Sequence, residues 1–577
     1  MTAPRQNVRV LIVIGAVGLA FAGLAFRLFQ LHVLQHKELL AQAVANSEQV
    51  LHRQGRRGQI LDANGNLLAN SLSARLVFAD PSVTCSQAVT TAHALAPLLQ
   101  MDEATLAGKL SSPGHYVRLK QKLNEDTIQQ VRALKLKGIG FEDQFMRLYP
   151  NGELASHVLG FVDAEHKGVQ GIEASMETFL QGQSGYEVVE RDRRGREIRA
   201  SRIEDLAPRD GFTVVLTIDQ VIQHVAEVEL EKAMVEFRPQ AATIIVSRPK
   251  TGEILAMSCR PTFDPNKAGD ATADARRNRC VSDLAEPGST FKIVTISTAL
   301  SEGLVRLEDR FNCENGAWLY GGRLLHDAHP YGVLSVEEIL FHSSNIGAAK
   351  IAVERMGQAR VYDAMRNFGF GNKTGIAIPG EVSGIVHPLS KWNKLSISRI
   401  PMGHEVSVTP IQMMMALNAV ANGGQLMKPL IVKSVLDEKG TPLMQYTPQL
   451  AGQPITPQAT ALMTTALRKV PSPVGTAPKA AVPRYDVAGK TGTAQKPVGG
   501  VYSESDYTSS FVGFLPAEQP EIGMIVVVDE PQPEHTGGLV AAPVFGEIGT
   551  QIVRYLDIPT TGYQTATATG DSSAVTD

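Results

Sequence analysis

An uncharged apolar run near the N-terminus constrains this chain more than any other feature. Residues 10–26, VLIVIGAVGLAFAGLAF, would form a helix about 25 Å long, enough to cross the apolar core of a bilayer. Arg5 and Arg9 precede the run, and basic residues favour the cytoplasmic side of a membrane. A cleaved signal peptide is the alternative, because Ala20-Phe21-Ala22 fits a cleavage site, but the apolar pattern continues to Leu34 and favours an uncleaved anchor. Both interpretations place the rest of the chain outside the cytoplasm.

Length and charge narrow the classes of function. With 577 residues the chain is too long for one hydrophobic core, so several domains are expected. A formal net charge of −3 provides no basic footprint for nucleic acid. No cysteine lies in a CxxC or Cys/His cluster, so no zinc or redox motif is present, and no metal or other cofactor is expected. Export would permit a disulfide, and its pairing is left open among Cys85, Cys259, Cys280 and Cys313.

The pattern of strands, turns and helices changes near residue 216. Residues 1–36 are interpreted as a cytoplasmic stub and membrane anchor, and 37–215 as a pedestal of turns and short strands without clustered catalytic residue types. From 216 to 557 a helix over 219–237 is followed by strand patterns, a mainly helical middle and a second group of strand patterns. This order predicts an α/β domain whose sheet uses strands from both of its ends. The small, polar tail, 558–577, is expected to be disordered.

Three short motifs stand in order within this second region. They are Ser289-Thr290-Phe291-Lys292 (SxxK), Ser343-Ser344-Asn345 (SxN) and Lys490-Thr491-Gly492-Thr493 (KTGT). The trio is the signature of penicillin-binding proteins and serine β-lactamases. Each motif alone is weak, because SxxK recurs at 247–250 and KTG recurs at 250–252 and 373–375.

Physical context selects among the copies. Ser289 follows Glu286-Pro287-Gly288 and opens a helical pattern, where backbone N–H groups can stabilise an oxyanion. Lys292, three residues later, lies on the same helical face and can deprotonate the hydroxyl if its amine is partly desolvated. At 247–250 a proline and a turn separate the serine from the lysine, so the pair is not held on one face.

The other two motifs supply the remaining catalytic and binding candidates. Ser343 offers a proton relay and Asn345 an amide for the substrate peptide, at the junction of a helix and a loop. Lys490 supplies positive charge for a substrate carboxylate, which the hydroxyls of Thr491 and Thr493 can also bind. Gly492 allows substrate to lie close to the strand backbone.

The chain resembles a class B penicillin-binding protein of the cell-division type (FtsI-like) over about residues 10–557. Beyond the trio, the resemblance is carried by Arg57-Gly58-Gln59-Ile60-Leu61-Asp62-Ala63-Asn64-Gly65, Arg147-Leu148-Tyr149-Pro150, His157, Gly160-Phe161-Val162-Asp163, Gly171-Ile172-Glu173, Thr217-Ile218-Asp219, Val408-Thr409-Pro410 with Gln412, Gly537-Gly538 and Ala542-Pro543-Val544-Phe545. The resemblance implies a penicillin-binding fold of α+β type, with an antiparallel sheet flanked by helices, an elongated α+β pedestal and one transmembrane helix.

The resemblance also implies a function. A serine-type peptidoglycan D,D-transpeptidase of this family crosslinks stem peptides through a serine acyl-enzyme and is acylated by β-lactam antibiotics. The backbone N–H groups of Ser289 and Thr493 would form its oxyanion hole. Expected partners are a SEDS-type glycosyltransferase and other divisome membrane proteins. The enzyme is expected in the inner (cytoplasmic) membrane at the division site, with its catalytic domain in the periplasm or at the cell exterior.

Several alternatives stay open. Gly403-His404-Glu405-Val406-Ser407 replaces the GYG-like pattern of many cell-division members, so an elongation-type or accessory paralogue is an alternative. A serine β-lactamase would need a deacylating glutamate, and no E-x-x-L-N-like segment follows Ser343. A non-catalytic scaffold or penicillin-sensing receptor is the remaining alternative, although such receptors have several membrane spans.

Overall fold

The computed structural model describes residues 4–40, 48–123, 125–191, 197–499 and 501–560. Most of the tail that was predicted to be disordered, residues 561–577, lies outside these ranges. Contacts divide the chain into two compact units, one formed by Met1–Arg56 with Gly182–Asp210 and the other by Arg57–Gln181 with Gly211–Asp577. The two units are described separately.

The first unit contains the apolar helix that the sequence predicts. Helix α1 (Pro4–Phe29) continues through a π-helical turn at Gln30–Leu34. The span Asn7–Leu34 has a mean hydropathy of 2.3 in its most apolar window, none of which is buried, and is long enough to cross a membrane. The unit also holds an antiparallel sheet of β1 (Glu48–Arg53), β6 (Gly185–Arg191) and β7 (Glu197–Leu206), in the order β1-β6-β7.

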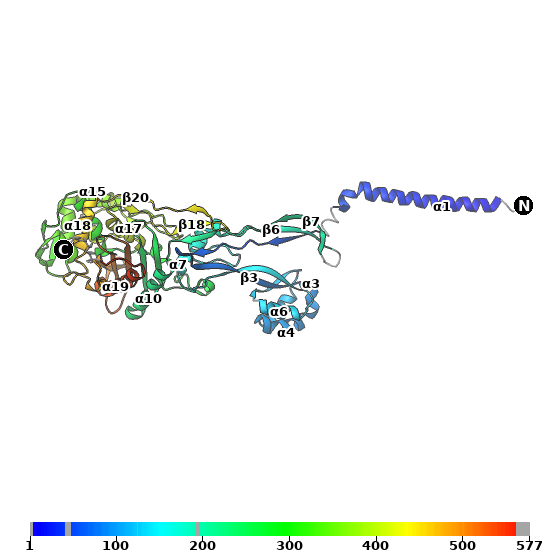
Figure 1. Ribbon diagram of the computed structural model, residues 1–577, viewed down its shortest axis with the longest axis horizontal. Helices are drawn as coiled ribbons and strands as arrows, with labels where there is room; N and C mark the ends of the chain where they lie inside the picture. The colour runs from blue at the N-terminus through cyan, green and yellow to red at the C-terminus, as the bar shows by residue number, and fades with distance from the viewer. Residues whose placement is uncertain (1–3, 41–47, 124, 192–196, 500, 561–577) are drawn as a thin grey trace, which may run out of the picture. The chain divides into compact units, whose positions relative to one another are not determined.

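The second unit begins with a small α+β layer built on the long strand β3 (Leu67–Ala79). Strand β3 pairs antiparallel with β2 (Ile60–Leu61), β4 (Val117–Leu123) and β5 (Ile139–Leu148). Helices α4 (Ala88–Leu99), α5 (Glu103–Leu110) and α6 (Glu125–Ala133) form a separate apolar core with this sheet, and in Figure 1 they lie beside one end of β3. The β2–β3 hairpin turns where the Asp62–Gly65 pattern predicts it.

A shared sheet joins this layer to the catalytic region. Strand β8 (Thr213–Leu216) runs parallel to β2 and antiparallel to β18 (Val432–Leu436), which pairs with β19 (Pro442–Gln445). A buried carboxylate reinforces the layer: Glu173 receives hydrogen bonds of 2.6 Å from Nε of both Arg57 and Arg147. Strands from before and after residue 216 therefore belong to one sheet.

The catalytic region is organised around a five-stranded antiparallel sheet in the order β10-β9-β23-β22-β21. The strands are β9 (Ala241–Ser247), β10 (Ile254–Arg260), β21 (Ala488–Val498), β22 (Val501–Leu515) and β23 (Ile522–Asp529). Every residue of β9 and β10 is buried, as expected for a sheet covered on both faces. Its strands come from both ends of the region, which confirms the predicted arrangement.

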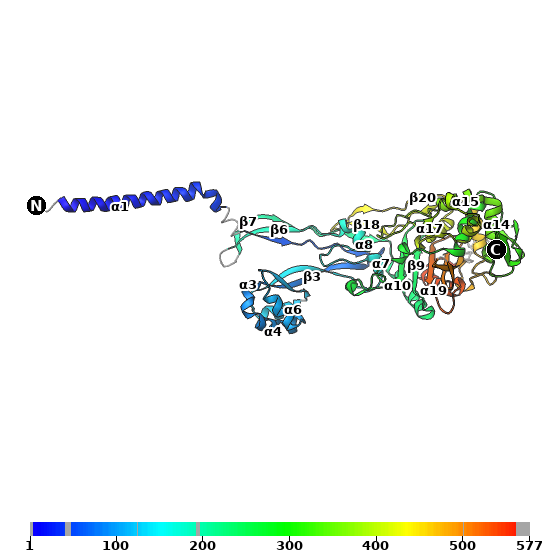
Figure 2. The ribbon, with the colours of Figure 1, turned by 180° about the vertical axis from the view of Figure 1, so that it is seen from behind.

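Helices cover both faces of this sheet. Ile244 and Val246 of β9 pack in one apolar core with α10 (Gln220–Phe237) and α19 (Gly537–Tyr555), grouped beside the sheet in Figure 2. Ile245 belongs to the other core, which holds α12 (Lys292–Ser301) and α17 (Pro410–Ala421). The helices between β10 and β21 are α11 (Arg279–Ser282), α12 (Lys292–Ser301), α13 (Val336–Phe341), α14 (Asn345–Ile351), α15 (Gly357–Asn367), α16 (Ser396–Arg399), α17 (Pro410–Ala421) and α18 (Pro457–Leu467).

Candidate active site

Ser289 lies in a tight turn that leads directly into a buried helix. Gly288–Phe291 forms one turn of 3₁₀ helix, and Lys292 is the first residue of α12. Gly288 has φ +56°, a conformation that glycine adopts without strain. The predicted helix start is therefore present, with the serine one short turn ahead of the regular α-helix. Ser289 is partly exposed, whereas Lys292 is completely buried.

The amine of Lys292 is surrounded by oxygen atoms. Its Nζ lies 2.9 Å from Ser289 Oγ, 2.8 Å from Asn345 Oδ1 and 2.6 Å from the carbonyl oxygen of Ser343. The Asn345 Nδ2 group donates to the carbonyl of His326 at 3.1 Å, which fixes the amide orientation so that Oδ1 faces the lysine. Both Asn345 Oδ1 and the Ser343 carbonyl can only accept hydrogen bonds.

The number of N–H bonds on the Lys292 amine, set against the acceptor oxygens around it, bears on its protonation state. A neutral amine has two N–H bonds and one lone pair, and the two acceptor-only oxygens use both N–H bonds. The lone pair is then free to accept the hydrogen of Ser289 Oγ. The surroundings of Lys292 thus suit a neutral amine that removes a proton from the serine hydroxyl.

Burial adjusts the lysine for this task. Desolvation lowers the pKa of Lys292 to about 7, while the negative charge of Asp327 opposes that shift. A lysine with its usual pKa would be almost wholly protonated at neutral pH and unable to accept a proton. Here a substantial fraction of the amine is neutral near pH 7.

Ser343 links the two lysines of the site. It lies between α13 and α14 with φ +63°, a strained conformation for a serine. Its hydroxyl oxygen lies 2.8 Å from Lys490 Nζ and 3.2 Å from Lys292 Nζ. The structure therefore brings Ser289, Lys292, Ser343, Asn345 and Lys490 into one connected group, as the motifs predict.

Lys490 is less accessible than the sequence suggests. It was expected to present positive charge to a substrate carboxylate, but this residue of β21 has a completely buried side chain. Desolvation, followed by the nearby amine of Lys292, holds the pKa of Lys490 well below its ordinary value. Two buried ammonium groups sharing one serine hydroxyl would repel each other, so protonation of one lysine disfavours protonation of the other.

The remaining KTGT residues place the edge strand β21 against the Ser289 turn. A Cβ on Gly492 would lie 3.1 Å from the carbonyl oxygen of Pro287 and 2.3 Å from Ser510 Oγ, so only glycine permits this approach. Thr493 Oγ1 accepts a hydrogen bond of 3.0 Å from Gly537 N. Thr491 Oγ1 lies 3.1 Å from Thr476 Oγ1, so both threonine hydroxyls already have protein partners.

One charged residue of the site was not anticipated. Asp327 Oδ1 accepts hydrogen bonds from the backbone N–H groups of Asn345 and Ile346, the latter at 2.9 Å, and Asp327 Oδ2 accepts from Ser344 Oγ at 2.6 Å. These contacts hold the start of α14, and with it Asn345, beside Lys292. No motif surrounds Asp327, and the turn that carries it precedes Asn345 by 18 residues, so the sequence contained no signal for it.

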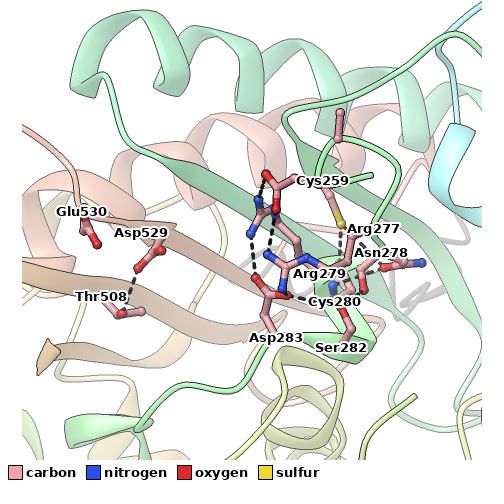
Figure 3. A network of polar contacts seen from close by, with 12 residues as sticks. Cys259, Arg277, Asn278, Arg279, Cys280, Ser282, Asp283, Thr508, Asp529 and Glu530 are labelled. Atoms are coloured by element: carbon pink, nitrogen blue, oxygen red, sulfur yellow. Dashed lines mark hydrogen bonds and ion pairs between the residues drawn. The ribbon is translucent and has the colours of Figure 1, made fainter. Parts of the chain in front are cut away.

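The segment before the nucleophile is anchored to the sheet, as Figure 3 shows. Arg279 Nη1 donates to Asp283 Oδ2 at 2.8 Å, and Asn278 caps the short helix α11. The sulfur atoms of Cys259 on β10 and Cys280 on α11 lie 3.6 Å apart. Both are free thiols in this structure, as are Cys85 and Cys313.

The repeated motifs lie in other surroundings. Ser247 Oγ is buried and receives a hydrogen bond from Asn418 Nδ2 at 2.9 Å, while Lys250 pairs with Glu521 at 2.9 Å on the surface. Thr374 of the KTG at 373–375 donates from its N–H and its hydroxyl to Glu381. Neither copy brings a serine and a lysine together.

An antiparallel sheet covered by helices, with a Ser–Lys pair beside a KTGT edge strand, defines the class of penicillin-interacting serine enzymes. Family comparison agrees. The penicillin binding protein transpeptidase domain matches residues 242–550, and the penicillin-binding protein dimerisation domain matches residues 52–216. The chain belongs to the class B penicillin-binding proteins and is a peptidoglycan D,D-transpeptidase.

Individual relatives cover nearly the whole chain. The probable peptidoglycan D,D-transpeptidase PenA of Neisseria meningitidis is 33% identical over 98% of this chain and 95% of its own length. Stage V sporulation protein D of Bacillus subtilis is 35% identical over 85% of this chain and 77% of its own. The peptidoglycan D,D-transpeptidase FtsI of Escherichia coli is 30% identical over 94% of this chain and 91% of its own.

Solved structures show the same fold. A peptidoglycan synthetase from Bifidobacterium adolescentis is similar with a TM-score of 0.72 and 29% identity, covering 92% of this chain and 98% of that one. Penicillin binding protein 3 from Mycobacterium tuberculosis, complexed with aztreonam, is similar with a TM-score of 0.68 and 27% identity, covering 88% and 98%.

Proposed function

We propose that this transpeptidase uses Ser289 as its acylated nucleophile and works in septal cell-wall synthesis on the outer side of the cytoplasmic membrane. The observation that carries the catalytic part is the Lys292 amine, buried with two acceptor-only oxygens and 2.9 Å from the Ser289 hydroxyl. A lysine so placed has a lone pair available for the serine proton.

Acylation follows from this arrangement. Neutral Lys292 takes the proton of Ser289 Oγ as the oxygen attacks the carbonyl carbon between the last two residues of a donor stem peptide. The backbone N–H groups of Ser289 and Thr493 stabilise the oxyanion that forms. When the C–N bond breaks, the departing D-alanine nitrogen takes a proton, delivered from Lys292 directly or through Ser343, and the lysine is neutral again.

Transfer reverses these roles. The amine of a neighbouring stem peptide attacks the acyl carbon and passes one proton to neutral Lys292, directly or through Ser343. When the C–O bond to Ser289 breaks, Ser289 Oγ takes a proton from Lys292, and the lysine is neutral again. The KTGT strand binds the donor peptide along β21. A β-lactam enters the same cycle at acylation and stays attached to Ser289, because its opened ring does not leave.

The membrane and septal assignments rest on other features. The span Asn7–Leu34 provides one anchor, with Arg5 and Arg9 at its cytoplasmic side. The matched dimerisation domain serves as a pedestal that binds a SEDS-type glycosyltransferase and other divisome membrane proteins. Relation to FtsI over most of both chains supports the septal role.

An accessory role is the second candidate. The identity to stage V sporulation protein D, 35%, exceeds the 30% identity to FtsI, and the Gly403–Ser407 segment departs from the GYG-like pattern. Depletion in the native cell separates the candidates. Filaments without septa, with the protein at mid-cell, support the septal proposal; round cells indicate elongation, and unchanged growth indicates an accessory enzyme.

A further inference from the structure

A second polar cluster, formed by Glu286, His404 and Tyr502, lies beside the turn that carries Ser289. Glu286 Oε2 lies 2.9 Å from His404 Nδ1, and Glu286 Oε1 accepts a hydrogen bond of 3.2 Å from the Tyr502 hydroxyl. The backbone N–H of Glu405 donates to the same Oε1 at 2.9 Å. One carboxylate, only 12% exposed, therefore connects three segments that are far apart in the sequence.

The contacts of Glu286 with His404 and Glu405 hold Gly403–Ser407, the segment that replaces the GYG-like pattern. Ala285 and Val408 exchange backbone hydrogen bonds of 3.1 and 2.9 Å, and Gly288 N donates to the Gly403 carbonyl at 3.3 Å. A Cβ on Gly403 would lie 2.1 Å from the Gly288 oxygen, so this close backbone approach requires glycine. The segment 403–408 thus runs directly along the turn that leads to the nucleophile.

Within this segment Glu405 is held in a strained conformation. It has φ +60°, which costs energy for a residue with a side chain and persists only where surrounding contacts enforce it. Those contacts are present: its carboxylate accepts from Ser396 Oγ at 2.6 Å and pairs with Arg399 at 3.4 Å. The strain places the Glu405 N–H where it reaches Glu286.

The hydrogen bond between Tyr502 and Glu286 links the turn to the β21–β22 hairpin, which carries the KTGT motif. Tyr502 pairs with Pro497 on the outer part of the β21–β22 hairpin, beyond a register shift after Gln495. Burial and the neighbouring Glu286 raise the pKa of Tyr502 far above its usual value, so the hydroxyl stays protonated and donates. The Tyr502 ring also packs edge-on against the His404 ring, with centroids 5.1 Å apart.

We infer that Glu286 is a positioning residue for acylation: its carboxylate ties the outer β21–β22 hairpin, through Tyr502, to the turn that carries Ser289. The oxyanion donors proposed above lie on both sides of this tie, Ser289 on the turn and Thr493 on β21. A small displacement between them weakens hydrogen bonds made only in the transition state. The inference rests on the proposed role of Ser289 as nucleophile.

The expected effect is therefore on the acylation step rather than on initial binding. In stopped-flow measurements with a fluorescent penicillin and the full-length protein in detergent, Glu286→Gln should lower the acylation rate constant about tenfold. Tyr502→Phe, which removes one hydroxyl, should lower it about fivefold. The dissociation constant of the initial complex should stay within about twofold of the parent, because ground-state contacts with the antibiotic are unaffected.

A matched control and a double variant separate positioning from general destabilisation. Tyr485→Phe also removes one tyrosine hydroxyl, which donates a hydrogen bond of 2.6 Å to the Ile558 carbonyl. This change should leave the acylation rate unchanged. In the Glu286→Gln/Tyr502→Phe protein the loss should be smaller than the product of the single losses, because both changes break one tie. If Glu286→Gln does not fold, Tyr502→Phe and its control carry the test.

Mapping of the penicillin adduct distinguishes the possible failures. Adducts on Ser289 with acylation rates within twofold of the parent in both single variants would overturn the positioning role alone. Losses that multiply in the double variant, or that Tyr485→Phe reproduces, would also overturn it. An adduct on another residue would overturn the nucleophile assignment and the inference that rests on it.

Discussion

Asn345 holds the amine of Lys292 through its side-chain oxygen, 2.8 Å from Nζ, while its own amide nitrogen donates to the His326 carbonyl. The amide is neutral, so it orients the lysine without stabilising the ammonium form as a carboxylate would. This distinction leads to the first prediction.

Asn345→Asp should move the pH dependence of acylation to more alkaline values by about one unit or more, because an adjacent carboxylate stabilises the protonated lysine. At pH 7 the variant should acylate slowly and should recover as the pH rises. Rates measured with a fluorescent penicillin between pH 5.5 and 9 check this. The matched control is Asn422→Asp at the end of α17, where the exposed side-chain amide also donates to a carbonyl, that of Gln425. An unshifted profile in Asn345→Asp would contradict the proposed base.

In the unaltered enzyme the acylation rate should fall as the pH drops below about 7, and this falling part of the profile is its acid limb. The pKa of Lys292 is lowered to about 7 by burial, and only the neutral amine can accept the serine proton. Acylation should therefore be nearly constant above this pH and fall about tenfold per unit below it. A profile that stays flat down to pH 5 would show that a group of lower pKa acts as the base.

Asp327→Asn should have two separable effects. Removing the negative charge removes the influence that opposes burial, so the acid limb should move to lower pH. Loss of charged acceptors at the start of α14 should also lower the free energy of unfolding by about 1 kcal/mol. Asp102→Asn weakens a comparable cap, at α5, and should reduce stability without moving the limb. Equal pH profiles in both variants would exclude a role for Asp327 in tuning the lysine.

Glu173 should be a principal stabilising residue of the region before the transpeptidase domain. Its fully buried carboxylate pairs with Arg57 and Arg147, so Glu173→Ala leaves two guanidinium groups without that partner and should cost about 3–5 kcal/mol in urea unfolding. Glu103→Ala breaks an exposed pair with His93 and should change stability by less than about 1 kcal/mol. Similar losses in the two variants would mean that the buried network contributes little.

The features that depend on local spacing, such as the Ser289–Lys292 pair, could be predicted from the sequence. Ser289 and Lys292 are three residues apart, so local helical geometry predicts that one lies beside the other, and the order of the motifs selected copies whose side chains come together. The strand patterns at both ends of the region, with a mainly helical middle between them, likewise predicted the sheet and its use of strands from both ends.

Contacts between distant segments were beyond that reasoning. Tyr502 reaches Glu286 across 216 residues, and no pattern near either residue signals the contact. The expectation that Lys490 presents its charge to substrate came from its residue type and its motif, whereas tertiary packing buries this side chain of β21 and places its amine 2.8 Å from the Ser343 hydroxyl. Burial of a single side chain depends on the assembled core, which is why its pKa could not be predicted from the motif.

The identity of the acylated residue tests the central proposal most directly. Full-length protein incubated with a fluorescent penicillin at pH 7.5 should carry one covalent adduct, located on Ser289 by peptide mass spectrometry, and Ser289→Ala should carry none. Ser247→Ala, a change in the other SxxK copy, should label like the parent wherever it folds. An adduct on any other residue, or labelling that persists in Ser289→Ala, would contradict Ser289 as the nucleophile.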